Sequence, residues 1–365
     1  MALGQPPLPG RAVVVGTGLI GGSVGMALRR LGWHVTGRDL DAERAAQALK
    51  LGALDAVGDD PDATVTFVAT PVRAIGREVL EALAKTAGLV TDVGSVKAPI
   101  VSAVADTRFV GGHPMAGSEQ DGVEGATPDL FQGATWVLTP TTRTDVAAYA
   151  HVQQLVSAFG AEVVALPPER HDELVAVISH VPHLTAATLM RLAAGRGEEQ
   201  RALLRLAAGG FRDMTRIAGG SSAIWPDICT ENRLAIVDVM DELLAALKDM
   251  RDLVANGDRS TLIDVLEEAR AARVNLPVLI GPADDLRELR IPVPDRPGVL
   301  SDVTTLATEL DINIADLEIA HSSEGPRGVL IVLVEAEAVP VLRDALAAKG
   351  YRSSVHPIDG LGLQA

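Results

Sequence analysis

The sequence predicts an α/β protein with a doubly wound parallel sheet first, an all-helical domain second and a small ferredoxin-like module last. Strands alternate with helices over residues 1–166, whereas residues 167–281 have helical periodicity with almost no strand-like alternation. Residues 286–362 follow the order βαββαβ. Pro277, Gly281 and Pro282 mark the linker before this last module.

The first domain begins with the apolar run RAVVVG, followed by a glycine cluster and a helical pattern from Val24 to Leu31. Further strands are predicted at WHVTGRD, ATVTFVAT, GLVTDVGS, TRFVGGH, ATWVLTP and AEVVALP. Because these runs are almost continuously hydrophobic, they indicate a parallel sheet that helices cover on both faces, as in a Rossmann fold.

The second domain is predicted from the helical runs HDELVAVISHVPHLTAATLMRLAA and SAIWPDICTENRLAIVDVMDELLAALKDMRDLVANGD. Trp225 and Pro226 are expected to begin one long helix, with Trp225 in domain packing. Ala, Leu and Val occupy much of the circumference of these helices, which favours burial against a second subunit and predicts a homodimer.

The net charge of the chain limits the classes of molecule that it can bind. The 365 residues include 32 Lys and Arg against 48 Asp and Glu, a formal net charge of −16. This charge disfavours nucleic acid and anionic membranes, and an anionic substrate would need a local cluster of cations. The single Cys229 cannot form an internal disulfide and is expected to be a small buried hydrophobe. The first residues lack a signal-peptide pattern and no apolar run approaches a membrane span, so a cytoplasmic protein is expected.

A dinucleotide-binding fingerprint lies between the first strand and the first helix. The glycines form GxGxxG, and Asp39 follows at the end of the next strand. Asp39 would bind the ribose hydroxyls and favour NAD, whereas Arg38 could instead face a 2′-phosphate or solvent. The sequence predicts NAD, and the predicted cofactor-binding residues are Gly16, Gly18, Leu19, Ile20, Gly21, Asp39 and Arg38.

The motifs GTGLIGGS, VTDVGSVK, FVGGHPMAGSE, ISHVPH and FRDMTRIA occur in this order along the chain. With them the sequence resembles the prephenate dehydrogenase family over nearly its whole length, with an ACT-like module at the end. The resemblance implies NAD-dependent oxidative decarboxylation of prephenate to 4-hydroxyphenylpyruvate in tyrosine biosynthesis. Arogenate dehydrogenation is the nearest alternative. A β-hydroxyacid dehydrogenase and a non-catalytic sensor of NAD and amino acids are further alternatives.

His113 and Ser95 are the candidate catalytic residues. The reaction needs a base at the ring hydroxyl, and an imidazole suits this role near neutral pH. His113 matches the family's catalytic histidine and is expected on a turn between glycines and Pro114. Ser95 matches a serine that binds the same hydroxyl, and it is also a candidate N-cap for a helix beginning at Val96. Lys97 and Asp92 share its loop, where a lysine is ordinarily solvated.

The candidate substrate-binding residues would receive the carboxylates of an anionic substrate. Arg212 and Arg216 would share a helix face, and Arg216 matches the family's substrate-binding arginine, although a surface ion pair with Asp213 is the structural alternative. The resemblance places His183 at the substrate, with His180 supporting it, and Glu119 beside the pocket. No metal is expected, since no third ligand completes a set near the two histidines.

The final module resembles ACT domains in PDRPGVLSDVT and INIADLEIA. Gly298 would let backbone N–H groups approach an amino-acid carboxylate at a helix N-terminus. The candidate regulatory residues are Asp295, Gly298, Asn313 and Ile314. Tyrosine, the end product, is the expected effector, and a purely structural dimerisation role is the alternative.

Overall fold

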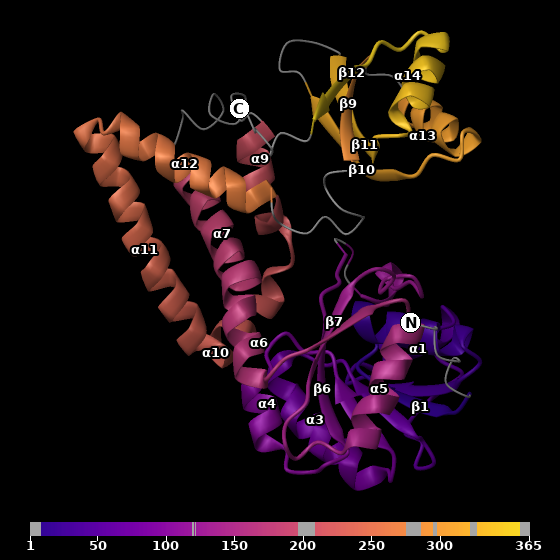
Figure 1. The fold of residues 1–365 in the computed structure, drawn as a ribbon. Coiled ribbons are helices and arrows are strands. Elements are labelled where there is room, and N and C mark those ends of the chain that lie inside the picture. The colour runs from indigo at the N-terminus through magenta and orange to yellow at the C-terminus, as the bar shows by residue number, and fades with distance from the viewer. Residues whose placement is uncertain are drawn as a thin grey trace. The chain divides into compact units, whose positions relative to one another are not determined.

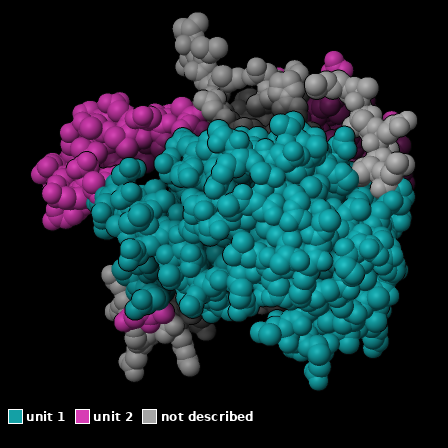
Figure 2. All heavy atoms as spheres, turned by 90° about the horizontal axis from the view of Figure 1, so that it is seen from below, with its two compact units in different colours: residues 1–192, 215–244 teal, residues 193–214, 245–365 magenta. Residues whose placement is uncertain are grey.

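The protein is described from a computed structural model that covers residues 9–118, 120, 122–195, 209–274, 286–294, 298–321 and 327–357 (Figure 1). It divides into two compact units (Figure 2). Unit 1 holds residues 1–192 and 215–244, and unit 2 holds residues 193–214 and 245–365. The linker prediction at residues 274–285 falls almost entirely outside the described residues, and the three domain boundaries stay a prediction.

Unit 1 contains an eight-stranded sheet with the order β3-β2-β1-β4-β5-β6-β7-β8. Its strands are β1 Arg11–Val15, β2 His34–Arg38, β3 Ala56–Val57, β4 Val65–Val68, β5 Leu89–Asp92, β6 Phe109–Pro114, β7 Thr135–Thr139 and β8 Glu162–Ala165. Pairing is parallel from β3 through to β6, and β7 runs antiparallel to β6. The doubly wound prediction is confirmed, but the expectation of a wholly parallel sheet is wrong at β7.

The antiparallel β7 follows from the kind of connection before it, residues 115–134. The described residues between β6 and β7 hold one 3-10 turn, Val123–Gly125, and no crossover helix. A parallel neighbour needs a crossover of a dozen or more residues, usually a helix that packs back on the sheet. Without such a helix, β7 returns beside β6 in the opposite direction.

Helices cover both faces of this sheet. They are α1 Leu19–Arg30, α2 Ala42–Lys50, α3 Val72–Lys85, α4 Ala98–Ala103 and α5 Val146–Ala158. Alternate residues of β1 enter different cores: Val14 packs with α1 and α5, whereas Val13 packs with α3 and α4. Both faces of the strand are therefore buried, which explains its unbroken hydrophobic run.

The helical part of the chain begins with three consecutive helical segments, α6 Pro168–Val175, a π-helical turn Ala176–His180 and α7 Val181–Ala194. Pro182 lacks an N–H and cannot continue the ordinary ladder, and the backbone widens in the turn before it. By length and composition alone residues 168–194 could cross a membrane, which qualifies the expectation that no apolar run approaches that length. Within this segment, the buried His171 and Asp172 form hydrogen bonds to other residues of unit 1.

The predicted long helix from Trp225 is interrupted at Asn232. The remaining helical elements are α9 Gly209–Thr215, 3-10 turns Arg216–Gly219 and Ser222–Ile224, α10 Trp225–Glu231, α11 Arg233–Asn256 and α12 Arg259–Val274. Cys229 is partly buried and packs with Ala176, Val181 and Ile236, and burial raises the pKa of its thiol. This setting agrees with the expectation of a small hydrophobe.

The last part of unit 2 is an antiparallel sheet of order β10-β11-β9-β12 with two helices. Its elements are β9 Leu286–Pro294, α13 Val299–Glu309, β10 Ile314–His321, β11 Arg327–Glu335, α14 Val339–Ala348 and β12 Ser354–Pro357. Alternate residues of β9 and β11 pack against both helices, for example Ile291 and Val332 against Leu306 and Leu342. The predicted βαββαβ order is confirmed.

Candidate functional site

The glycine-rich loop lies where β1 enters α1. Gly16 has φ +91°, and a Cβ there would lie 2.5 Å from the carbonyl oxygen of Ala69. A Cβ on Gly21 would lie 1.9 Å from the carbonyl oxygen of Gly16, so only glycine permits the turn to pack on the helix. The Cβ position of Gly18 faces open space within 4 Å, where a phosphate group can approach the backbone. Leu19 and Ile20 form the first turn of α1, half-buried.

Asp39 is held beside this loop. Its Oδ2 accepts hydrogen bonds from the backbone N–H of Thr17 at 2.8 Å and from the Thr17 hydroxyl at 3.2 Å. Its Oδ1 accepts the N–H of Asp41 at 3.0 Å. The carboxylate is therefore fixed at the end of β2, where it fits the ribose hydroxyls of a dinucleotide.

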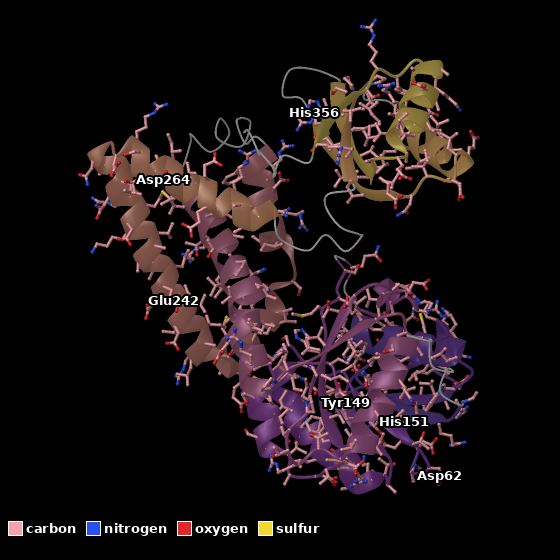
Figure 3. The ribbon with its side chains drawn as sticks, in the orientation of Figure 1. Asp62, Tyr149, His151, Glu242, Asp264 and His356 are labelled. Atoms are coloured by element: carbon pink, nitrogen blue, oxygen red, sulfur yellow. The ribbon has the colours of Figure 1, made fainter. Side chains whose placement is uncertain are left out.

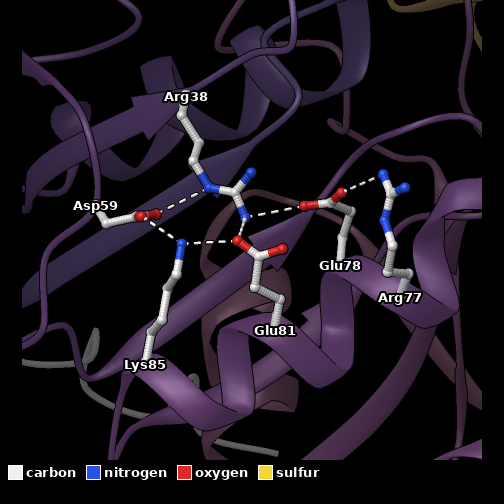
Figure 4. Close-up of polar contacts among 6 residues, drawn as sticks. All are labelled: Arg38, Asp59, Arg77, Glu78, Glu81 and Lys85. Atoms are coloured by element: carbon white, nitrogen blue, oxygen red, sulfur yellow. Dashed lines mark hydrogen bonds and ion pairs between the residues drawn. The ribbon is translucent and has the colours of Figure 1, made fainter.

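Arg38 is engaged on the side of α3 by a cluster of charged residues (Figure 4). Its Nε donates to Asp59 at 2.8 Å, and one terminal nitrogen donates to Glu78 at 2.9 Å and Glu81 at 3.3 Å. Lys85 donates to both Asp59 and Glu81 at 2.7 Å. Three carboxylates thus already hold the guanidinium, and this arrangement favours Asp39 and NAD over a 2′-phosphate.

His113 lies inside β6, paired with Val137 of β7, so the prediction of a turn is wrong. Pro114 ends the strand, and this position tolerates proline because it is a strand terminus. The half-buried ring places Nδ1 2.8 Å from Nε2 of His171. Burial lowers the pKa of His113 well below its usual value, helped by the nearby His171 and Lys97, so the imidazole is neutral at physiological pH.

His171 and Asp172, in the middle of α6, are candidate site residues that the sequence motifs did not indicate. His171 is fully buried, and its Nδ1 lies 2.8 Å from Oδ1 of Asp172. The carboxylate of Asp172 also accepts the N–H groups of Lys97 and Ala98, both at 2.8 Å. Asp172 therefore accepts hydrogen bonds from the backbone N–H groups at the N-terminus of α4, although it follows Lys97 by 75 residues in the sequence.

The N-cap interpretation of Ser95 is wrong. Helix α4 begins at Ala98, with Lys97 at the N-cap position. Ser95 stands two residues earlier in the loop after β5, and its side chain is half-buried. Among the residues that the structure describes, its hydroxyl has no hydrogen-bond partner and remains available for a ligand. Since β1, β2, β5 and β6 are parallel, the loops carrying Gly16, Asp39 and Ser95 share the carboxyl edge with His113.

Lys97 is fully buried, contrary to the expectation of a solvated lysine. Its Nζ forms an ion pair with the equally buried Asp92 and donates to the carbonyl oxygen of Gly112 at 2.8 Å. Asp92 also accepts the N–H groups of Gly94 at 2.9 Å and Gly112 at 3.1 Å. Burial lowers the pKa of Lys97, and Asp92 opposes that effect. Through these hydrogen bonds the ion pair connects the loop that carries Ser95 to Gly112, the residue before His113.

The two histidines near Pro182 differ in setting. His180 is buried, and Asn232, at the break between α10 and α11, donates to its Nδ1 at 3.1 Å and to the carbonyl oxygen of Asp172 at 2.8 Å. Burial lowers the pKa of His180 to about 4. The half-buried ring of His183 stacks on Trp225 at 3.6 Å between centroids. Trp225 therefore contacts both histidines, in addition to its expected role in domain packing.

The candidate cations lie at the end of α9. Arg216 begins the 3-10 turn after the helix and belongs to unit 1, whereas Arg212 lies in α9 within unit 2. Both side chains are exposed in the single chain. The α-helix ends at Thr215, so the expected shared helix face does not extend to Arg216. Glu119 lies outside the described residues, and the described residues hold no cluster of three or more metal-ligating side chains.

In the last module Gly298 has φ +92° and precedes α13 as its N-cap residue. A left-handed conformation of this kind strains any residue with a Cβ, which agrees with the choice of glycine. Asn313 is exposed and Ile314 half-buried at the start of β10. Asp295 lies outside the described residues.

Comparison with known families divides the chain into three matches. Residues 24–165 match the prephenate dehydrogenase nucleotide-binding domain, residues 167–268 match the prephenate dehydrogenase dimerization domain, and residues 287–349 match the ACT domain.

Full-length relatives agree with these matches. The chain is 35% identical over 342 residues to a prephenate dehydrogenase of Bacillus subtilis, covering 89% of this chain and 92% of the relative. It is 32% identical to a cyclohexadienyl dehydrogenase of Zymomonas mobilis, covering 72% and 94%.

Solved structures are similar over about three quarters of the chain. A prephenate dehydrogenase from A. aeolicus, in complex with hydroxyphenyl propionate and NAD+, has a TM-score of 0.69 and 29% identity, with 74% of this chain and 99% of that chain covered. The Synechocystis arogenate dehydrogenase has a TM-score of 0.64 and 30% identity, with 72% and 98% covered.

Proposed function

The chain belongs to the prephenate dehydrogenase family and is an NAD-dependent oxidoreductase, and from this premise we propose that it oxidises prephenate with loss of carbon dioxide to give 4-hydroxyphenylpyruvate. Arogenate, which carries an amino group where prephenate has a keto group, is the second candidate, and an arogenate dehydrogenase is among the similar structures. The prediction of NAD and of the enzyme class is confirmed.

The observation that carries the proposal is a neutral His113 at the carboxyl edge of the sheet, on the same edge as the dinucleotide loop. NAD+ bound at Gly16, Gly18 and Asp39 would accept a hydride from the ring carbon that bears the hydroxyl. His113 takes the hydroxyl proton as that carbon is oxidised, and its lowered pKa keeps it able to do so. The free hydroxyl of Ser95 hydrogen-bonds the same oxygen and orients it toward the base.

Arg216 is assigned to a substrate carboxylate. In a chain of net charge −16 a dianion needs local cations, and a guanidinium holds a carboxylate through two hydrogen bonds. His183, held flat by Trp225, presents a ring edge for a polar contact with the substrate. Arg212 and Glu119 complete the proposed substrate residues by family resemblance.

The test is an assay of nicotinamide reduction by the purified chain with prephenate and with arogenate, each with NAD+ and NADP+. We expect kcat/KM to be highest for prephenate with NAD+. A higher value for arogenate would reassign the substrate, and a preference for NADP+ would show that Arg38 leaves its cluster. Tight NAD+ binding without turnover of either compound would contradict the proposed activity.

The last module is proposed to bind tyrosine and to inhibit the enzyme. Its support is the ACT match and the left-handed Gly298 at the N-terminus of α13, an 11-residue helix whose first backbone N–H groups can bind a carboxylate. Tyrosine must bind the inactive arrangement of a homodimer better than the active one to have this effect. The dimer is supported by the dimerization-domain match, and a cytoplasmic location is expected for such an enzyme.

Deletion of residues 285–365 tests this regulation. We expect the shortened enzyme to retain turnover and to lose its response to tyrosine. If tyrosine still inhibits it, tyrosine competes in the catalytic site, and the module serves dimerisation alone.

A further inference from the structure

The hydrogen bonds around His171 define where its protons lie. Both oxygens of Asp172 are acceptors, and they already receive the N–H groups of Lys97 and Ala98. Because a carboxylate has no proton to give, the 2.8 Å contact with His171 requires that Nδ1 of His171 carry the proton. Nε2 of a neutral His171 is then an acceptor.

The same reasoning extends to His113. Its Nδ1 lies 2.8 Å from Nε2 of His171, and one of the two nitrogens must donate. Since Nε2 of His171 is the acceptor, Nδ1 of His113 carries the proton. Nε2 of His113 is left with a free lone pair, which is the form that a base at the substrate hydroxyl needs.

We propose that His171 and Asp172 are positioning residues that select the reactive tautomer of His113 and stabilise the imidazolium formed when it accepts the hydroxyl proton. This inference rests on the proposed role of His113 as the base. The bond that forms is from Nε2 of His113 to the hydroxyl proton, and the oxygen keeps the electron pair of the O–H bond. The positive charge on His113 is then stabilised, through His171, by the carboxylate of Asp172.

Three contacts keep this pair in place. Asp172 is bound to two successive N–H groups at the start of α4, and its own carbonyl oxygen accepts from Asn232. The groups that face the two rings are Lys97, His180 and the carboxylate of Asp172. His171 is fully buried and cannot exchange its partners for water. The arrangement is therefore set before a substrate binds, as preorganised catalysis requires.

The first test observes the tautomer directly in the full-length protein. Ring nitrogens of 15N-histidine-labelled enzyme are assigned by comparison with His113→Asn and His171→Gln. We expect a protonated Nδ1 and an unprotonated Nε2 in His113 at neutral pH. The opposite tautomer would overturn the proposal without reference to any activity.

The second test separates positioning from structural support. His171→Leu removes the acceptor, and we expect kcat to fall tenfold or more while KM and the Kd for NAD+ change little. His171→Gln can turn an amide oxygen toward Nδ1 of His113, so it should recover part of the lost rate. A fall in NAD+ affinity as large as the fall in kcat, or no recovery with Gln, would indicate a structural role instead.

The matched control is His151→Gln. His151 extends from α5 in unit 1, as does Tyr149 (Figure 3). Its ring makes an edge contact with Trp33. We expect unchanged turnover in this variant. The double variant His113→Asn/His171→Leu should be no slower than His113→Asn alone, because the two substitutions remove the same function.

The outcomes distinguish the two proposals. Full activity in His113→Asn contradicts the proposed base. A large loss in His113→Asn with full activity in His171→Leu contradicts only the positioning role.

Discussion

Two groups of charged and polar side chains on unit 1 use similar chemistry in different surroundings. The His113 network consists of Asp92, Lys97, His113, His171 and Asp172, and its ion pair Lys97–Asp92 has no exposed side-chain surface. The Arg38 cluster consists of Arg38, Asp59, Glu78, Glu81 and Lys85, and the side chains of Arg38 and Lys85 are 25% and 44% exposed. Each group connects elements distant in sequence.

Burial decides what each group can do. In the Arg38 cluster, hydrogen bonds with Asp59 and Glu81 raise the pKa of Lys85. Glu78 is buried, but the other four charged side chains are partly exposed, so water can solvate them when a partner leaves. In the His113 network a removed partner leaves an unsolvated charge, so the side chains have one arrangement. A defined arrangement of this kind is what proton transfer needs, and we infer that the protein accepts the cost of buried charge where its reaction takes place.

The largest expected effect is on stability. Lys97→Met leaves the carboxylate of Asp92 buried without its counter-ion, and we expect the free energy of unfolding to fall by about 3–5 kcal/mol. Urea denaturation measures the change. Lys85→Met, the matched change in the Arg38 cluster, should cost less than about 1 kcal/mol. Equal losses in the two variants would contradict the comparison.

A second effect of burial is a dependence of stability on pH. The pKa of His180 is about 4 in the folded chain, below the ordinary value near 6.5. Between these values the unfolded chain binds the proton and the folded chain does not, so stability falls as pH is lowered from about 6.5 to about 4. The fall from this group approaches about 3 kcal/mol. His180→Asn should flatten that part of a stability-against-pH curve, and an unchanged slope would contradict the assignment.

The third prediction concerns the base. His113→Asn should lower kcat about a hundredfold or more, the scale of lost general-base catalysis, and leave the Kd for NAD+ unchanged. Steady-state kinetics and NAD+ titration give the two values. A variant with near-normal kcat would show that the network supports the fold without serving the reaction.

Arg216 gives the fourth prediction. Arg216→Ala should raise KM for prephenate. The expected loss of binding free energy is about 1.5–3 kcal/mol, which is the contribution of a hydrogen bond to a charged group. Arg216→Lys keeps the charge but loses the paired geometry, so its KM should be intermediate. If kcat/KM for prephenate is the same in all three proteins, Arg216 does not bind the substrate.

The smallest effect is expected in the Arg38 cluster. Glu78→Gln removes one partner, but Arg38 keeps Asp59 and Glu81, so stability should change by less than about 1 kcal/mol. The preference for NAD+ over NADP+ should also remain, because Asp39 repels a 2′-phosphate. The ratio of kcat/KM for the two cofactors tests this, and a gain for NADP+ would show that Glu78 restrains Arg38.

Features encoded in short stretches could be predicted from the sequence. The strand–glycine–helix order located Gly16 and Asp39, the apolar runs located most strands, and the motifs identified His113 as the candidate base, although they predicted a turn there instead of β6. These features depend on neighbouring residues, whose periodicity and backbone requirements are visible in the chain itself.

The features that only the tertiary structure decided depend on contacts between residues that are distant in the sequence. His113 meets His171 across 58 positions, and Asp172 satisfies the start of α4 across 75, a distance at which local pattern carries no information. Lys97 looked like an ordinary surface lysine because burial is a property of the packed fold. By itself the sequence determined the sheet, the dinucleotide loop and the candidate base. The packing of α6 on the loop after β5 decided which protons that base carries, because hydrogen bonds among buried groups form only once their elements have come together.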